Sequence, residues 1–285
     1  MTAADTRLAV LGAGVMGTAI ATLAIGRGFA VTLLDVDAGA LERARRAVPQ
    51  QLRMARLMGA LPRGAGAGEL TTTSAIYDLA GAGAVVESVT ELPRVKARVL
   101  AEASAVVAPG TLLMTNTSGI PVDELADAVA RPQDLVGTHF MNPPYLIRTV
   151  EVIRGPRSGD AAMAAVLELL EALDREGIVV GDGPGFVINR ILQRTINEAA
   201  RMVQEQLATP EAVDGLFTGC LGHASGPLAT ADLIGLDNVV DSLRVLRDRT
   251  GDAGYEPCEL LLTKVGSGDF GRKTGRGFFD HRKAL

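Results

Sequence analysis

Hydrophobic residues in the first two thirds of the chain form short β-branched runs that alternate with longer segments of helical periodicity. The short runs predict strands at 8–11, 31–35, 84–87, 111–115, 136–139, 150–153 and 178–180. The longer segments predict helices at 16–25, 41–58, 94–107 and 161–173. Strands that alternate with helices are typical of βαβ units, so this part of the chain predicts an α/β fold with a parallel sheet.

The pattern changes after Asp182-Gly183-Pro184-Gly185. Helical periodicity continues at 186–207, 238–249 and 258–265, and no strand is predicted between these segments. We therefore expect a first domain at 1–183 and an all-α C-terminal domain at 184–285.

Composition narrows the classes of protein to consider. With 285 residues, of which 47% are hydrophobic, the chain is long enough to bury a sizeable core. The formal net charge of −5 provides no overall basic field, so neither nucleic acid nor a membrane is an expected partner. Cys220 and Cys258 form neither a disulfide framework nor a metal-ligand cluster, which predicts buried thiols in a reducing cytoplasm and no metal site.

The uncharged segment 8–26 contains four glycines and continues into a second strand, so it is expected to be neither a signal peptide nor a membrane span.

A glycine motif, G-x-G-x-x-G, follows the first predicted strand at Gly12, Gly14 and Gly17. Glycine permits a tight turn and close approach of the backbone to a pyrophosphate, and the helix that starts near Val15 and Met16 offers its N-terminal N–H groups to the phosphates. A glycine-rich turn would show the same three residues. A strand, the motif, a helix and a second strand within about thirty residues instead predict a Rossmann-type dinucleotide-binding domain.

Asp35 ends the second predicted strand. A carboxylate at this place can accept hydrogen bonds from the ribose hydroxyls of the adenosine and repels a 2′-phosphate, and Val36 and Asp37 bring no basic neighbour. NAD is therefore the expected cofactor rather than NADP. The alternative is that Asp35 only caps a turn.

Acid-base chemistry has few candidate residues. The histidines of the chain are His139, His223 and His281. His139 ends a predicted strand, and ligands bind at the carboxyl ends of strands in open α/β sheets. Glu151 lies within an otherwise apolar strand, so it needs a partner if it is buried. Pairing with His139 would create a general acid-base group, whereas pairing with Arg148 or Arg154 would leave His139 an ordinary core or surface residue.

Eight motifs are spread along nearly the whole chain. They are VLGAGVMG (10–17), VVESVTE (85–91), NTSGIPV (116–122), GTHFMNP (137–143), VEVI (150–153), DGPGFVINR (182–190), DLIGLD (232–237) and GRKTGRGFF (271–279). Together they resemble the 3-hydroxyacyl-CoA dehydrogenase family, including its bacterial 3-hydroxybutyryl-CoA branch. The resemblance implies an NAD-dependent oxidoreductase that interconverts a 3-hydroxyacyl thioester and its 3-oxoacyl thioester.

The resemblance also implies roles for individual residues. It makes His139 the general base or acid and Glu151 its orienting partner, with Ser118 and Asn189 as polar contacts near the reacting oxygen. Asn142 is implied to support the loop that follows the histidine and to lie near the substrate. The implied cofactor contacts outside the glycine motif are Glu91, Lys96 and Asn116, the first two toward the nicotinamide end.

The chain departs from the family pattern around the implied acyl path. The usual NTSS is NTSG (116–119), the Met-Lys pair before VEVI is Ile147-Arg148, and the usual MGP is SGP (225–227). These differences leave the acyl group open. Segment 222–238 resembles dehydrogenases of polyketide extender-unit pathways, so oxidation of a glyceryl group on an acyl carrier protein is the alternative function.

Basic residues gather in one segment of this acidic protein. Between 42 and 63 the charged residues are Arg43, Arg45, Arg46, Arg53, Arg56, Arg63 and one acid, Glu42. One interpretation is the solvated face of an amphipathic helix. The other is an arm in which Arg53 and Arg56 bind the phosphates of CoA or an acidic helix of an acyl carrier protein.

Other functions are compatible with the same fold. A lens-type structural protein or a redox-sensing regulator needs no acid-base pair, and hydroxyacid dehydrogenases of the 6-phosphogluconate type generally use lysine where this chain offers His139. The family resemblance further implies a homodimer, for which the leucine-rich segments 241–246 and 259–262 are the candidate interface.

Overall fold

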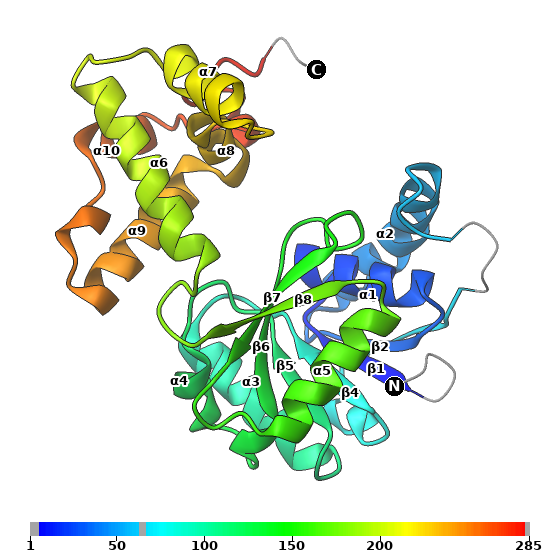
Figure 1. Ribbon diagram of the computed structural model, residues 1–285. Helices are drawn as coiled ribbons and strands as arrows, with labels where there is room; N and C mark the ends of the chain where they lie inside the picture. Colours follow the sequence, from blue (N-terminus) through cyan, green and yellow to red (C-terminus); the bar gives the residue numbers. More distant parts are fainter. Residues whose placement is uncertain (1–5, 63–66, 283–285) are drawn as a thin grey trace. The chain divides into compact units, whose positions relative to one another are not determined.

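The computed structural model describes residues 6–62 and 67–282. It divides into two compact units, Met1–Phe186 and Val187–Leu285 (Figure 1). The division falls just after the boundary predicted at 183, and each unit has a hydrophobic core of its own.

The N-terminal unit is built on one sheet. Its strands are β1 (Arg7–Leu11), β2 (Ala30–Leu34), β3 (Leu70–Thr73), β4 (Ala84–Glu87), β5 (Leu112–Thr115), β6 (Leu135–Phe140), β7 (Thr149–Arg154) and β8 (Glu176–Gly181). They lie in the order β3-β2-β1-β4-β5-β6-β7-β8. The sheet is parallel from β3 to β6, as predicted, whereas β7 runs antiparallel to β6 and β8 runs parallel to β7.

Helices cover both faces of this sheet (Figure 1). They are α1 (Val15–Gly26), α2 (Ala38–Leu57), α3 (Pro93–Val106), α4 (Val122–Ala126) and α5 (Asp160–Ala172). Because successive side chains of a strand point to opposite faces, Leu8 and Val10 of β1 join the core under α1, α2 and α5, and Ala9 and Leu11 join the core under α3 and α4. The predicted α/β fold is thereby confirmed.

Strand β3 was not predicted. Its sequence, Leu-Thr-Thr-Thr, shows no apolar alternation, and none of its side chains is fully buried. Backbone hydrogen bonds to β2 at the sheet edge hold it in place, and such bonds leave no trace in a hydrophobic pattern.

The C-terminal unit is helical, as predicted. It contains α6 (Ile188–Gln204), α7 (Pro210–Leu221), α8 (Pro227–Ile234), α9 (Leu236–Thr250) and α10 (Glu259–Gly266). Helices α7 and α8 were not predicted, although each has proline at its first position, where the missing N–H costs nothing. Among the leucines proposed for an interface, Leu243, Leu246 and Leu261 are buried in the core of their own unit, whereas Leu260 and Leu262 are only partly buried against it.

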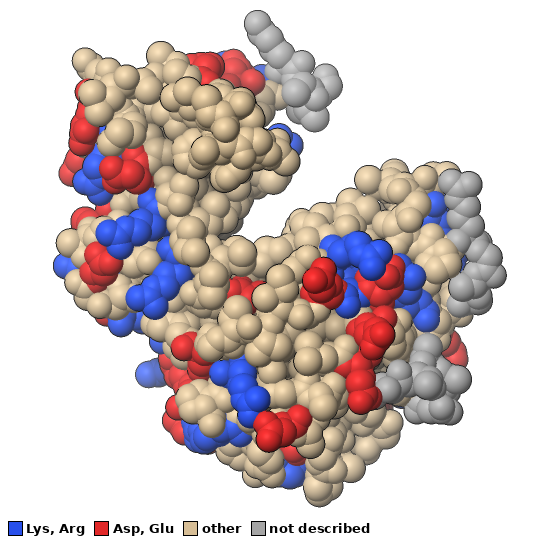
Figure 2. All heavy atoms as spheres, viewed as in Figure 1, with Lys and Arg blue, Asp and Glu red and all other residues tan. Residues whose placement is uncertain are grey.

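Two surface properties bear on the expected partners. None of the helices in the described ranges is both long enough and apolar enough to span a membrane. Basic and acidic side chains are interspersed on the face shown in Figure 2.

The prediction of two buried thiols was wrong for Cys220, which is exposed near the end of α7. Cys258 is buried, as predicted.

Candidate active site

Polar and glycine residues at the carboxyl ends of four strands lie at one edge of the sheet of the N-terminal unit. Gly12 follows β1, Glu87 ends β4, Asn116 follows β5 and His139 is the penultimate residue of β6. These four strands are parallel neighbours, so their carboxyl ends meet at the edge where open α/β sheets bind ligands.

The glycine loop excludes a Cβ at Gly12 and Gly17 and borders open space at Gly14. Gly12 has a φ of +98°, and a Cβ there would lie 2.6 Å from the carbonyl oxygen of Ser88. A Cβ on Gly17 would lie 1.8 Å from the carbonyl oxygen of Gly12, whereas Gly14, the N-cap of α1, faces open space. Val15 is 72% exposed beside a cavity of about 640 Å³, and Met16 packs partly against the core. Backbone N–H groups at the start of α1, next to a cavity of this size, fit the pyrophosphate of a dinucleotide.

Asp35 joins the end of β2 to the glycine loop. Its Oδ2 accepts a hydrogen bond from the N–H of Ala13 at 2.7 Å and its Oδ1 accepts one from the N–H of Asp37 at 2.9 Å. Each oxygen retains a second lone pair for a ribose hydroxyl, so the turn and the ribose interpretations are compatible. Arg43, a member of the basic segment, also lines this cavity. It pairs with Asp37 at 3.1 Å, and the N–H of Gly39 together with Arg43 lowers the pKa of Asp37.

A buried ionic cluster connects β4, α3 and the segment after β5. The Nζ of Lys96 lies 2.8 Å from Oε1 of Glu87 and 3.1 Å from Oε2 of Glu91, and both Lys96 and Glu87 are fully buried. Thr115 donates to Oε2 of Glu87 at 2.7 Å. Lys96 contacts both carboxylates, and Thr115 contacts Glu87 as well. These contacts compensate for the cost of removing the charges from water.

Glu91 connects this cluster to Ser118. It accepts hydrogen bonds from Oγ1 of Thr117 at 2.5 Å, from the N–H of Ser118 at 2.8 Å and from Oγ of Ser118 at 3.1 Å. Partial burial opposes ionisation of Glu91, but attraction to Lys96 and the hydrogen bonds from Thr117 and Ser118 outweigh it, so the pKa of Glu91 lies below its usual range. Three predicted site residues, Glu91, Lys96 and Ser118, therefore belong to one network.

His139 and Glu151 face each other across the antiparallel pair β6 and β7. They are direct partners in the strand register, and Nδ1 of His139 lies 3.0 Å from Oε2 of Glu151. Both side chains are buried. The ring of Phe186 packs against the imidazole at a centroid distance of 6.2 Å. The alternative, in which Glu151 pairs with Arg148 or Arg154, is contradicted, since Arg148 pairs with Asp174 and Arg154 pairs with Asp160.

Two predicted asparagines are connected with the end of β6, Asn116 through a hydrogen bond and Asn142 through its position two residues after the strand. Oδ1 of Asn116 accepts a hydrogen bond from the N–H of Phe140 at 3.0 Å, which fixes the end of the strand that carries His139. Asn142 precedes Pro143 through a cis peptide bond.

The other predicted residues lie elsewhere. Asn189 is in the first turn of α6, in the C-terminal unit. On α2, Arg53 is exposed and Arg56 is half-buried, while Arg63 lies outside the described residues. Arg45 and Arg46 pair with Glu42 on the surface, as a solvated helix face would.

Sequence reasoning did not single out three residues of the site. Glu87 could have been found from the sequence, because it is a carboxylate in an otherwise apolar strand, as Glu151 is. Phe186 and Thr117 had none, since their contacts with His139 and Glu91 depend on long-range packing. A buried imidazole oriented by a carboxylate, at the same edge of the sheet as a dinucleotide-sized cavity, can exchange a proton with a substrate hydroxyl during hydride transfer.

Comparison with known proteins agrees with this geometry. The profile described as "3-hydroxyacyl-CoA dehydrogenase, NAD binding domain" matches residues 7–183, and that of the "C-terminal domain" of the same family matches residues 185–281. The chain is 38% identical to a probable 3-hydroxybutyryl-CoA dehydrogenase of Deinococcus radiodurans, over 96% of this chain and 100% of the relative. It is 36% identical to a probable 3-hydroxybutyryl-CoA dehydrogenase of Bacillus subtilis, over 97% and 98% of the two chains.

A solved structure gives the same result for the fold. The crystal structure of (S)-3-hydroxybutyryl-CoA dehydrogenase from Ralstonia eutropha superposes with a TM-score of 0.89 at 32% identity, covering 97% of this chain and 99% of the other. The family resemblance, the fold and the NAD cofactor expected from the sequence are all confirmed by these matches. The chain belongs to the 3-hydroxyacyl-CoA dehydrogenase family, and its N-terminal domain is the NAD-binding domain of these oxidoreductases.

Proposed function

We propose that this enzyme interconverts a short 3-hydroxyacyl-CoA of the 3-hydroxybutyryl type and its 3-oxoacyl counterpart, with His139 as the acid-base residue. The observation that carries the proposal is the 3.0 Å contact between Nδ1 of His139 and Oε2 of Glu151 at the ligand-binding edge of the sheet. The relatives from Deinococcus radiodurans and Bacillus subtilis, which bear the name of this activity, support the choice of acyl group.

The pairing determines which nitrogen of His139 exchanges the proton. An ionised Glu151 accepts a hydrogen bond from Nδ1–H, so the lone pair of the neutral imidazole lies on Nε2. In the oxidation, Nε2 takes the proton of the 3-hydroxyl group, and Glu151 stabilises the imidazolium that forms. NAD supplies the hydride acceptor for C3. In the reduction, His139 returns the proton to the 3-oxo oxygen.

Ser118 and Asn189 are the proposed polar contacts of the reacting oxygen. Ser118 is suited to this role because Glu91 fixes both its backbone N–H and its hydroxyl group. Asn189 is assigned on the family resemblance, at the start of α6. Asn142 is proposed to support the loop after His139 and to line the substrate site.

The proposed cofactor contacts follow the edge of the sheet. Those at the adenosine and pyrophosphate end are Gly12, Gly14, Val15, Met16, Gly17 and Asp35. Those toward the nicotinamide are Glu91, Lys96 and Asn116, and the buried ionic cluster supports this end of the site. Asp35 and Asp37 together place negative charge where NADP would carry its 2′-phosphate, which favours NAD.

A direct assay separates the proposed substrate from its alternative. Reduction of NAD is measured side by side with 3-hydroxybutyryl-CoA and with a glyceryl group on an acyl carrier protein. We expect the CoA thioester to be oxidised with the higher kcat/KM. A strong preference for the glyceryl-carrier substrate would replace the proposed acyl group and leave the acid-base pair unchanged.

Arg53 and Arg56 are proposed to bind the anionic part of the thioester carrier. Both lie near the C-terminal end of α2, and the Nε of Arg56 is buried without a hydrogen-bond partner among the described residues. Reversal of both to glutamate should raise KM for the thioester and leave NAD affinity unchanged, and added salt should weaken binding to the unmutated enzyme. Arg46→Glu is the matched control, because Arg46 lies on the same helix and pairs with Glu42. An unchanged KM in the double variant would make the segment a solvated face only.

We further propose that residues 184–285 contribute to substrate binding and form the interface of a homodimer. Several large apolar side chains of α6 and α7 are exposed, namely Ile188, Ile191, Leu216 and Leu221. An apolar helix face of this kind is typical of an association surface. Ile191→Glu should convert a dimer to a monomer in analytical ultracentrifugation.

Free Cys220 and Cys258 support a cytoplasmic location.

A further inference from the structure

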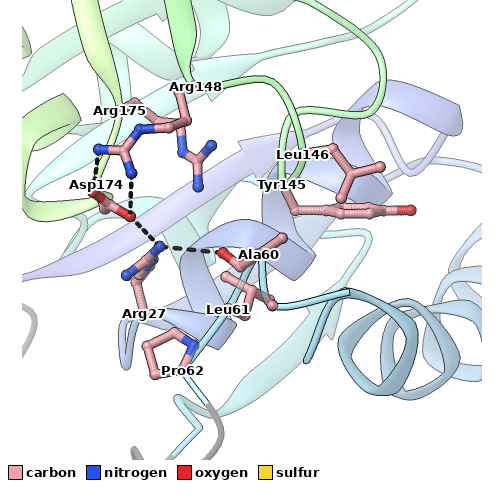
Figure 3. Close-up of a pocket in the computed structure, with 10 residues that line it drawn as sticks. Arg27, Ala60, Leu61, Pro62, Tyr145, Leu146, Arg148, Asp174 and Arg175 are labelled. Carbon is pink, nitrogen blue, oxygen red and sulfur yellow. Dashed lines mark hydrogen bonds and ion pairs between the residues drawn. The ribbon is translucent and has the colours of Figure 1, made fainter. Parts of the chain in front are cut away.

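A second cavity of the N-terminal unit is surrounded by arginines. Its volume is about 350 Å³. It is lined by residues 59–62 after α2, by residues of the segment 145–148 before β7, by Asp174 and Arg175 before β8, and by Arg27 at the end of α1 (Figure 3). None of these residues belongs to the glycine loop or to the pair His139 and Glu151, so this cavity is separate from the site described above.

Three arginines and one carboxylate line this cavity. Nη2 of Arg148 lies 2.6 Å from Oδ1 of Asp174, and Arg27 donates to Oδ2 of Asp174 and, at 3.2 Å, to the carbonyl oxygen of Ala60. Arg175 is only 5% exposed, and it donates to the carbonyl oxygen of Ile147 at 3.1 Å. With three positive charges and one negative charge, the cluster carries a formal charge of 3 − 1 = +2 in a protein of net charge −5.

Asp174 is the one acid among the residues that line the cavity, so it compensates only part of the charge of the three arginines. The Nε of Arg27 is buried and has no hydrogen-bond partner among them. Burial and repulsion by Arg27 lower the pKa of Arg175, and repulsion by Arg148 adds to the effect, while Asp174 opposes it. Asp174 provides one negative charge for three arginines, of which Arg27 and Arg175 are largely buried. An anion bound in the cavity would add the missing counter-charge and an acceptor for buried donors.

The walls of the cavity indicate the class of anion. A phosphate monoester carries a charge of about −1.5 to −2 at pH 7 and three acceptor oxygens, which matches a surplus of two positive charges on planar donor forks. A carboxylate would neutralise only one of the two charges. Tyr145, Leu146, Leu61 and Pro62 provide apolar surface beside the arginines, enough for a small organic group (Figure 3). We propose that this cavity binds the terminal phosphate of a small phosphorylated molecule, with Arg27, Arg148 and Arg175 as its ligands.

A ligand at this place would hold together segments that are distant in sequence. Arg27 and Asp174 are 147 residues apart, and Arg148 immediately precedes β7, the strand that carries Glu151. Binding of the phosphate should therefore raise the melting temperature of the protein, since a ligand that binds only the folded state stabilises it.

The test measures binding by calorimetry at constant ionic strength, with inorganic phosphate and with adenosine 3′,5′-bisphosphate as probes and chloride as the reference anion. Arg148→Gln should weaken binding roughly tenfold or more, because it removes one charge-assisted donor pair. Arg154→Gln is the matched control, since Arg154 lies at the other end of β7 in a surface ion pair, and its affinity should equal that of the unmutated protein. Circular dichroism of each variant establishes that it is folded.

Asp174→Asn distinguishes a binding site from a structural clamp. Asp174 has a φ of +56°, which asparagine tolerates, so the backbone can be retained. Loss of its negative charge should tighten phosphate binding several-fold if the arginines serve an anion. Binding of both probes identifies the phosphate group itself as the ligand, and binding of the bisphosphate alone identifies a nucleotide phosphate such as that of CoA. Equal affinities of phosphate and chloride, an unaffected Arg148→Gln variant, or weaker binding by a folded Asp174→Asn variant would each overturn the proposal.

Discussion

Two carboxylates of the same sheet, Glu87 on β4 and Glu151 on β7, are buried with partners of different kinds. Glu87 contacts the ammonium group of Lys96 at 2.8 Å and the hydroxyl of Thr115 at 2.7 Å. Glu151 contacts the imidazole of His139 at 3.0 Å. Both carboxylates leave water, so both need partners to compensate for desolvation, but only one of these partners titrates near neutral pH in its ordinary state.

The partner decides what each carboxylate can do. Lys96 directs its donors at Glu87 and Glu91, and Glu91 in turn fixes Ser118, so this cluster is a scaffold for the loop after β5. His139 uses one ring nitrogen for Glu151 and offers the other to a substrate in the proposed mechanism. A buried carboxylate therefore supports either a rigid loop or a proton transfer, according to whether its partner is an ammonium group or an imidazole.

The largest expected effect is on the imidazole pair. His139→Gln should lower kcat by at least about two orders of magnitude with NAD affinity nearly unchanged, because general acid-base catalysis contributes that much. Glu151→Gln should lower kcat less, since the amide oxygen still accepts from Nδ1–H but no longer stabilises an imidazolium. Adding Glu151→Gln to the His139 variant should cost little more.

Steady-state kinetics of the single and double variants test this cooperation. His223→Gln is the control, because His223 is exposed in the C-terminal unit. Fully additive losses in the double variant would mean that the two residues do not act as a unit.

The second expected effect is on the stability of the ammonium cluster. Lys96→Met leaves Glu87 buried without its cation and should lower the free energy of unfolding by about 3–5 kcal/mol. Glu87→Gln should cost less, because the amide is neutral and Lys96 keeps Glu91, and the double variant should recover part of the loss. Urea unfolding monitors the change, with Arg98→Met as an exposed control on the same helix. A loss below about 1 kcal/mol for Lys96→Met would contradict the role of this cluster as a scaffold.

Asp35 offers a third case, a carboxylate whose hydrogen bonds come from backbone N–H groups. Asp35→Ala should weaken NAD binding by roughly tenfold, as expected for loss of hydrogen bonds to a charged group, and should narrow the preference for NAD over NADP. Fluorescence titration with both cofactors measures the ratio. Equal use of NAD and NADP by the unmutated enzyme would rule out this role for Asp35.

The smallest expected effect concerns the acid dependence of Glu91. Because the pKa of Glu91 is lowered in the folded state, its ionisation stabilises the protein above the unfolded pKa, near the ordinary value of 4.5, and this contribution is lost as the pH falls through the folded value. Thr117→Val removes one donor and should cost about 0.5–1 kcal/mol at neutral pH. Part of this cost should disappear on acidification.

Unfolding free energies of the Thr117 variant from about pH 7 to about pH 3 test this dependence. Thr218→Val is the matched control, because it makes the same substitution at a threonine whose hydroxyl donates to the backbone carbonyl oxygen of Asp214 at 3.1 Å. A carbonyl acceptor does not titrate, so the cost of the control should not vary with pH. A difference between Thr117→Val and the unmutated protein that stays constant over the whole range would separate Thr117 from the titration of Glu91.

Much of the fold followed from local patterns in the sequence. Seven strands and the main helices of the N-terminal unit coincide with predicted segments, because buried parallel strands and amphipathic helices leave strong periodic signals. The glycine motif predicted the first turn, since the φ of +98° at Gly12 and the close contact at Gly17 require residues without a Cβ. The prediction missed strand β3 and helices α4, α7 and α8, whose local signals are weak.

Local patterns left long-range pairing open, and the pairing of His139 with Glu151 was favoured only by the family resemblance. Residues 139 and 151 are twelve positions apart, and only the antiparallel register of β6 and β7 places them opposite each other, where a slip of one residue would turn one side chain to the other face. The contacts of Phe186 with His139 and of Arg27 with Asp174 likewise depend on packing between distant segments. The sequence by itself determined which elements form and which residue types are available for chemistry, because these depend on local propensity and hydrophobic pattern. The tertiary structure alone decided which carboxylate meets an imidazole, which meets an ammonium group and where arginines gather around a cavity, because these depend on strand order, register and the packing of helices.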